Sequence, residues 1–333
     1  MNYKTDKTHQ AIVCRHLNLG KSLFVTLVTG VMLMMMSCTD PDTTDATLVI
    51  DPVVGQSVFV TADDAANALV KAIESRDEES LGQLLGDNYH QVLPLDNVDD
   101  GDVDNFIAAW EQSHSMLSEG DNKRLLAVGD NKWTLPIPIV AGESGWYFDV
   151  EEGVERMLIR RIGRNELAAM QAVLAYHDAQ MEYAEQDHND NGKLEYAQQF
   201  VSTPETHDGL YWQTESDETS SPLGPLITDH TSSGGYHGYF YKILKAQGEH
   251  ARGGAYNYMM GDDMRSGFAL IAWPVEYGES GVMSFLVSQA GLVYEQNLGP
   301  DGAGIAGEIQ EYDPSPGWIL VQEVSDSQAS YRK

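Results

Sequence analysis

Oxygen-bearing side chains recur at alternate positions between residues 187 and 198, a spacing typical of a calcium loop. In such a loop, side chains at positions one, three, five and nine supply oxygens, position six is glycine, and position seven offers its backbone carbonyl. Gly192 falls at position six, but Gln198 replaces the usual bidentate glutamate at position twelve. We expect weak binding, with a Kd of roughly 10⁻⁴ to 10⁻³ M, and the alternative is a plain Asn-Gly turn. The candidate ligands are Asp187, Asn189, Asn191, Lys193 through its carbonyl, and Glu195.

A second group of candidate residues is aromatic and lies between residues 211 and 258. Aromatic rings beside acidic and amide groups can stack on sugars or hold an extended peptide, but tyrosines can equally fill a core with their hydroxyls at its surface. We favour the core and keep the ligand-binding surface as a weak prediction. Its members are Tyr211, Trp212, Tyr236, Tyr239 and Tyr241, with Phe240, Tyr256 and Tyr258 close in sequence.

Other residues that could carry chemistry have simpler interpretations. Four arginines could form an anion site or pair with the acidic surface, and we favour pairing. His177 lies in an apolar helical stripe, which favours a hydrogen-bonded core histidine over a ligand or base. The sequence has no HExxH, GxSxG or phosphate-loop motif, and its catalytic residues, if any, stay unknown. The arginines are Arg156, Arg160, Arg161 and Arg164.

The composition limits the classes of partner. The chain has 333 residues, enough for two domains, and carries 51 acidic against 20 basic residues, for a formal net charge of -31. This charge excludes proteins that neutralise nucleic-acid phosphates with clustered Lys and Arg. It also disfavours attachment to anionic membranes through basic patches, so we expect membrane contact only through a lipid anchor.

Residues 1–37 have the features of a bacterial signal peptide. Four basic residues precede the apolar run Leu23–Met36, which is shorter than the roughly 20 residues of a membrane-spanning helix. Cys38 follows directly after Ser37 and is the candidate lipid-attachment residue of a lipoprotein, although Met35 stands where leucine is usual. The alternatives are an ordinary signal peptide and an uncleaved anchor.

Processing before Cys38 would have consequences for charge, chemistry and location. The mature chain would keep 50 acidic and 16 basic residues, a net charge of -34, and would lose Cys14. A single cysteine excludes an intramolecular disulfide, and a lipidated one is no nucleophile. Residues 38–57 then form an acidic tether. We expect an exported protein on the periplasmic side of the cell envelope, anchored in the outer membrane.

The first folded domain is expected at residues 58–150. Thr61 can cap a helix whose apolar residues share one face, and further helices are expected at 79–85 and 106–116. The pattern then changes to strands separated by turns. Helices followed by a curved meander predict an α+β cone of the nuclear-transport-factor-like kind. The predicted strands are 125–128, 133–140 and 146–150.

A second α+β domain is expected at residues 151–322, followed by a tail at 323–333. It would begin with a helix at 151–162 and a long amphipathic helix at 165–186. Three strands joined by tight turns then predict an antiparallel meander, the first of them covered on both faces. A long helix on such a sheet is similar to the globular part of type IV pilins. The predicted strands are 268–273, 282–287 and 292–295.

Several segments together resemble one family, the bacterial Domain of Unknown Function 2950 family, over roughly residues 64 to 318. The resemblance implies an exported envelope protein, and it implies no reaction and no catalytic residues. The segments that carry it are Gly145–Asp149, Arg160–Leu167, Asp208–Trp212, Ser221–Pro225, Gly238–Leu244, Gln247-Gly248, Gly267–Pro274 and Tyr277-Gly278.

Two functional hypotheses follow from these observations. The first is a non-enzymatic envelope lipoprotein that binds a partner, either an envelope protein or a glycan. The second is an envelope hydrolase acting on glycan or peptide, and it requires a pocket with two carboxylates about 5 to 10 Å apart.

Overall fold

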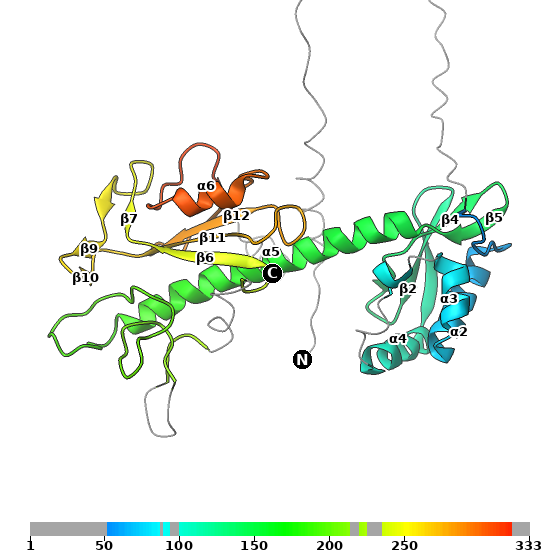
Figure 1. Cartoon of the computed structure of the whole chain (residues 1–333), viewed down its shortest axis with the longest axis horizontal. Helices are drawn as coiled ribbons and strands as arrows, with labels where there is room; N and C mark the ends of the chain where they lie inside the picture. The colour runs from blue at the N-terminus through cyan, green and yellow to red at the C-terminus, as the bar shows by residue number, and fades with distance from the viewer. Residues whose placement is uncertain (1–51, 87–88, 94–99, 214–219, 225–234, 322–333) are drawn as a thin grey trace, which may run out of the picture. The chain divides into compact units, whose positions relative to one another are not determined.

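The computed structural model describes residues 52–86, 89–93, 100–213, 220–224 and 235–321. The chain divides into two compact units, Met1–Ile159 and Arg160–Lys333. Each unit combines helices with antiparallel sheet (Figure 1), so the predicted α+β class is confirmed. The predicted signal peptide, Cys38 and the tail at 323–333 lie outside the described residues.

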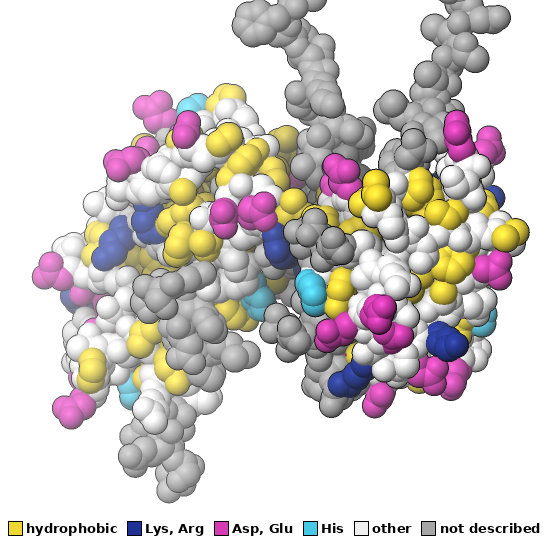
Figure 2. All heavy atoms as spheres, turned by 45° about the vertical axis from the view of Figure 1, so that its right-hand side comes forward, with side chains coloured by type: hydrophobic (Ala, Val, Ile, Leu, Met, Phe, Trp, Pro, Cys, Tyr) yellow, Lys and Arg dark blue, Asp and Glu magenta, His cyan; other side chains and the backbone are white. Residues whose placement is uncertain are grey.

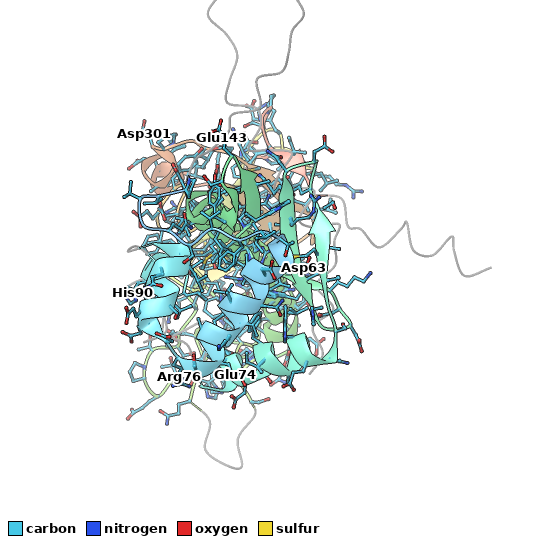
Figure 3. All side chains as sticks on the ribbon, turned by 90° about the vertical axis from the view of Figure 1, so that its right-hand side faces the viewer. Asp63, Glu74, Arg76, His90, Glu143 and Asp301 are labelled. Carbon is cyan, nitrogen blue, oxygen red and sulfur yellow. The ribbon has the colours of Figure 1, made fainter. Side chains whose placement is uncertain are left out.

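Two capped helices form one side of the first unit. Thr61 precedes α2 (Ala62–Ser75), and its hydroxyl oxygen accepts the N–H of Asp64, as expected for a cap. Asp77 plays the same part for α3 (Glu78–Leu85). Figure 3 labels Asp63 near the start of α2 and Glu74 and Arg76 at its end. A short 3₁₀ helix, η2 (Tyr89–Gln91), follows α3, and α4 spans Asp100–Gln112.

The sheet of the first unit has the order β1-β2-β4-β5, with β3 paired to β2. The predicted helix at 106–116 is corrected to 100–112, because the residues after it form an edge strand. The predicted strand at 133–140 is two strands, because Pro136 and Pro138 have no N–H for the ladder. The nuclear-transport-factor-like cone stays a prediction. The strands are β1 (His114–Ser118), β2 (Lys123–Val128), β3 (Trp133–Thr134), β4 (Ile139–Gly142) and β5 (Gly145–Phe148).

The folded part of the first unit begins within the segment expected to be a tether. Gln56 Nε2 donates to the carbonyls of Leu84 and Phe148, at 2.9 and 2.8 Å. The N–H of Ser57 donates to the carbonyl of Gln83 at 2.7 Å. These bonds join the end of the tether to α3 and to β5.

One continuous helix, α5 (Val150–Tyr183), replaces the two helices predicted at 151–162 and 165–186. Asp149 starts it, because its Oδ1 accepts the N–H of Glu152 at 2.9 Å. Gly163 does not interrupt it, since a glycine inside a helix costs only about 1 kcal/mol relative to alanine. The helix ends at Tyr183, whose carbonyl lies 3.0 Å from Nε2 of His188.

The second unit is built on an antiparallel sheet with the order β14-β13-β12-β11-β6. The predicted three-strand meander is confirmed: Ile271 pairs with Leu286, and Leu286 pairs with Tyr294. Two small hairpin sheets join β7 to β8 and β9 to β10. The strands are β6 (Tyr239–Leu244), β7 (Ala246–Gln247), β8 (Tyr256–Asn257), β9 (Met259–Met260), β10 (Asp263–Met264), β11 (Ala269–Pro274), β12 (Ser284–Ser288), β13 (Val293–Gln296) and β14 (Ile319–Leu320).

Helices cover both faces of this sheet. The residues of β11 from Ala269 to Ala272 are completely buried, as predicted for a strand covered on both faces. Figure 1 shows α5 along one face and α6 (Gly302–Glu308) over the other. Tyr176 of α5 and Ala306 of α6 belong to the same buried core. The pilin-like likeness stays a prediction.

Candidate functional site

The predicted calcium loop folds as a series of tight turns closed by its own side chains. The carboxylate of Asp187 accepts the N–H of Gly192 at 2.7 Å and the N–H groups of Asn189 and Asn191 at 3.3 Å. The Gly192 bond is the main cause that lowers the pKa of Asp187. Gly192 has a φ of +78°, as the predicted Asn-Gly turn requires.

Three residues of the predicted ligand set make side-chain contacts, two of them with each other. Asn189 Nδ2 donates to Glu195 Oε1 at 2.6 Å, and Lys193 Nζ pairs with Asp263 at 2.7 Å. Burial, together with the neighbouring Asp263, raises the pKa of Glu195. Gln198 is bound elsewhere, because its Nε2 donates to Asp262 and its Oε1 accepts from a lysine. Within the described parts of the chain, no group of three or more His, Cys, Asp or Glu residues is arranged to hold a metal ion.

Calcium binding by this loop stays a prediction with a direct test. At 10 mM calcium, a site with a Kd of roughly 10⁻⁴ to 10⁻³ M would stabilise the fold by about 1.4 to 2.7 kcal/mol. Thermal melts with calcium and with chelator should therefore differ by several degrees. The difference should vanish in Asp187→Ala and persist in Glu185→Gln, a charge change just before the loop. Equal midpoints with calcium and chelator in the unmodified chain would leave the loop a plain turn.

The predicted aromatic surface is distributed between different surroundings. Tyr239 is completely buried on β6, and its hydroxyl donates to the carbonyl of Met283 at 2.9 Å. Tyr241 is partly buried and donates to the carbonyl of Tyr236 at 3.3 Å. Tyr211 is partly buried against the core. These rings pack mainly against the protein itself.

Trp212 belongs to a ring cluster that sequence reasoning missed. It stacks on His207 with centroids 4.4 Å apart, and His188 lies 5.6 Å from it. His188 in turn stacks on Tyr183 at 4.0 Å. Burial lowers the pKa of His188. His188 is far from Trp212 in the sequence, and a turn separates His207 from Trp212. No periodic pattern therefore marks the two histidines.

Two of the four clustered arginines, Arg156 and Arg161, pair with carboxylates in the described structure. Arg156 pairs with Glu119 and Glu152, and Lys123 also pairs with Glu152. Arg161 Nη2 lies 2.5 Å from Glu279 of the second unit. Where the structure shows the partners of these arginines, the partners are carboxylates. This agrees with charge pairing and not with an open anion site.

His177 packs as expected for a core histidine. Its side chain is mostly buried, and its ring lies 5.7 Å from that of Phe268. Its Nδ1 lies 2.9 Å from the exposed carboxylate of Asp178.

A buried carboxylate on α5 holds the turn before β12, a contact that the sequence did not predict. Glu166 is 7% exposed, and its Oε1 accepts the N–H groups of Val282 and Met283 at 3.0 and 2.9 Å. The preceding residue, Asn165, donates from its Nδ2 to the carbonyl of Ser280 at 2.8 Å. The helix therefore binds the backbone of this turn directly.

Two clefts open on the second unit. The Ser284 cleft, of about 330 Å³, lies between the end of β11, the start of β12 and residues 298–303. The Trp318 cleft, of about 420 Å³, has Leu286 and Trp318 among its lining residues. Its lining includes three carboxylates, from Glu308, Glu311 and Asp313. We take these two clefts as candidate binding sites within the part of the chain that the structure describes.

A family model described as "Protein of unknown function (DUF2950)" matches residues 56–321, which is most of the chain. The chain belongs to this family. No curated protein and no solved structure matches the chain. The resemblance expected from the sequence is thereby confirmed, and the family brings no reaction with it.

Of the segments that carry the resemblance to the DUF2950 family, two line the Ser284 cleft and a third holds the turn next to it. Segment Arg160–Leu167 supplies the α5 side chains that hold the turn before β12. Segment Gly267–Pro274 ends in the wall of the cleft, and Tyr277 of segment Tyr277-Gly278 also lines it. These segments therefore position a cleft in addition to building a core.

Carboxylates outnumber Lys and Arg on the visible surface of this DUF2950 chain (Figure 2). Acidic side chains are spread over the visible face of both units, with fewer Lys and Arg among them (Figure 2). Among the described residues, no helix combines the length and the apolar character needed to cross a membrane.

Proposed function

We propose that this protein is an exported lipoprotein of the bacterial envelope that binds a partner without catalysing a reaction. The observation that carries the proposal is the position of Cys38, directly after the apolar run Leu23–Met36 and one serine. A short apolar run that ends in a small residue and a cysteine is the arrangement that lipoprotein processing requires. The lipid would hold the folded units on the periplasmic side of the outer membrane.

The binding half of the proposal rests on the folded units. A mature charge of -34 repels other acidic chains and attracts cations. The two clefts of the second unit offer recesses for a protein segment or a sugar, which are the two partner classes expected in the envelope.

Substitution of Cys38 tests the anchor. Cys38→Ser should abolish incorporation of labelled palmitate and move the protein from the membrane fraction to a soluble fraction. Cys14→Ser is the matched control, because this cysteine lies before the apolar run and would leave with the signal peptide. Labelling that survives Cys38→Ser, or recovery of the unprocessed chain in the cytosol, would contradict the proposal.

A hydrolase acting on envelope glycan is the second candidate, and the Trp318 cleft is the observation that favours it. Carboxylate pairs carry out glycoside hydrolysis, and an aromatic ring can stack on a sugar. Asp313 is already bound to His250. The Asp313 carboxylate lies 2.9 Å from His250 Nδ1 and accepts the backbone N–H of His250 at 2.8 Å. Glu308 and Glu311 are the carboxylates left to act as acid and base.

Release of soluble sugar from purified cell-wall glycan tests the hydrolase. If the second candidate is right, Glu308→Gln or Glu311→Gln should lower the rate about 100-fold or more. Glu182→Gln makes an equal change of charge at an exposed position of α5 and should not lower the rate. An unmodified chain that releases no sugar would eliminate this candidate for glycan and leave the binding protein.

A further inference from the structure

The Ser284 cleft has the composition of a small-molecule site. Its walls are mostly apolar and include Val282, Leu298, Pro274 and Ala303. A volume of about 330 Å³ is at the lower end for ligand pockets in proteins. Apolar walls with a few placed polar groups are typical of such pockets.

Ser284 places one polar group inside this apolar cleft. The residue is 1% exposed and lines the cleft, and within the described parts of the chain its hydroxyl has no hydrogen-bond partner. Ser288, four residues along the same strand, is also buried, but its hydroxyl oxygen accepts the N–H of Ala290 at 3.4 Å. Because the Ser284 hydroxyl lines the cleft and makes no bond to the described protein, it can bond to a ligand that supplies a donor or acceptor.

Hydrogen bonds fix the backbone just before Ser284 in the wall of the cleft. The carboxylate of Glu166 accepts the N–H groups of Val282 and Met283, the two residues before Ser284. The hydroxyl of Tyr239 donates to the carbonyl of Met283 at 2.9 Å. A wall fixed in this way loses little freedom on binding, and this lowers the cost of association.

The charge of the cleft selects against anions. Glu276 is the one ionisable side chain apart from the Tyr277 phenol among the residues that line the cleft in the described structure, and it is exposed. A carboxylate or phosphate ligand would meet this carboxylate and the negative field of the whole chain.

We propose that the Ser284 cleft binds a small uncharged molecule with an apolar body and one hydrogen-bonding group. The apolar body lies against Val282 and Leu298, and the polar group bonds to the Ser284 hydroxyl. The inference concerns a ligand site separate from the lipid anchor, and it holds whether or not Cys38 is lipidated.

Three probes of similar size test the proposal: benzyl alcohol, toluene and benzoate. Binding to the full chain carrying Cys38→Ser is measured by saturation-transfer NMR. We expect benzyl alcohol to bind with a Kd on the order of 1 to 10 mM, as its few heavy atoms allow. Toluene should bind about five-fold more weakly because it makes no hydrogen bond, and benzoate more weakly still.

Three variants locate the binding. Ser284→Ala should remove the difference between benzyl alcohol and toluene while leaving the melting temperature equal or higher. Ala303→Phe should fill the cleft and abolish binding of all probes, whereas Ile305→Phe, on the same helix and outside the cleft, should leave binding intact.

The proposal is overturned by any of three results in a folded protein. These are the absence of transfer to every probe at 20-fold excess over the expected Kd, binding that survives Ala303→Phe, and tighter binding of benzoate than of benzyl alcohol. If Ser284→Ala does not fold, the Ala303→Phe and Ile305→Phe pair decides the question.

Discussion

Replacing Glu166 by alanine should lower the free energy of unfolding of the Arg160–Lys333 unit by about 2 to 4 kcal/mol. The carboxylate is buried and accepts the N–H groups of Val282 and Met283 at 3.0 and 2.9 Å. Alanine would leave both donors without this acceptor, next to a small cavity where the side chain was. Urea unfolding, followed by the fluorescence of the tryptophans, measures the change.

Two further variants separate the hydrogen bonds from a general effect on α5. Glu166→Gln keeps one acceptor oxygen and should cost less than alanine, because the charge is lost but not the acceptor. Glu182→Ala changes an exposed residue of the same helix and should shift stability by no more than about 0.5 kcal/mol. Similar losses for Glu166→Ala and Glu182→Ala would mean that the contact between the helix and the turn contributes nothing.

Gly281→Ala should destabilise the same unit by about 3 kcal/mol, near the upper end for added atoms in a packed core. A Cβ at Gly281 would lie 2.6 Å from Cζ of Tyr239 and closer still to its hydroxyl oxygen. Tyr239 cannot move aside freely, because its ring is completely buried and its hydroxyl donates to Met283. Thermal or urea unfolding against the unmodified chain measures the loss.

Gly304 of α6 provides the matched control. A Cβ there meets no atom within 4 Å, and its backbone is helical. Gly304→Ala should therefore stabilise the unit by about 0.5 to 1 kcal/mol through the greater helix propensity of alanine. If Gly281→Ala unfolds at the same urea concentration as the unmodified chain, the Tyr239 ring has room to shift and the steric argument is wrong.

Local patterns in the sequence were sufficient for much of the fold. Thr61 begins α2 as a hydroxyl cap does, because the partner N–H lies only three residues away. The apolar run that became β11 is buried on both faces, as a strand without polar alternation must be. The order of the meander followed from its short turns, because a tight turn places two consecutive strands side by side and antiparallel.

Boundaries were less well predicted where two tendencies compete. Two helices were expected, at 151–162 and 165–186, but α5 is continuous because the helix tolerates Gly163 at a small cost. Residues 114–116 were expected to continue a helix, and pairing of β1 with β2 takes them into the sheet. In both cases tertiary contacts decided between conformations of similar local energy.

The sequence by itself determined the α+β class, the family, the excess of carboxylates and the turn at Gly192, because each depends on composition or on residues close together in the chain. It also carries the case for Cys38 as the anchor. Only the tertiary structure decided that Glu166 is a buried acceptor for residues 116 and 117 positions away, and that Ser284 lies in a cleft with segments 274–277 and 298–303. Such contacts depend on how strands and helices pack, and no local spacing encodes the distance between residues so far apart in the chain.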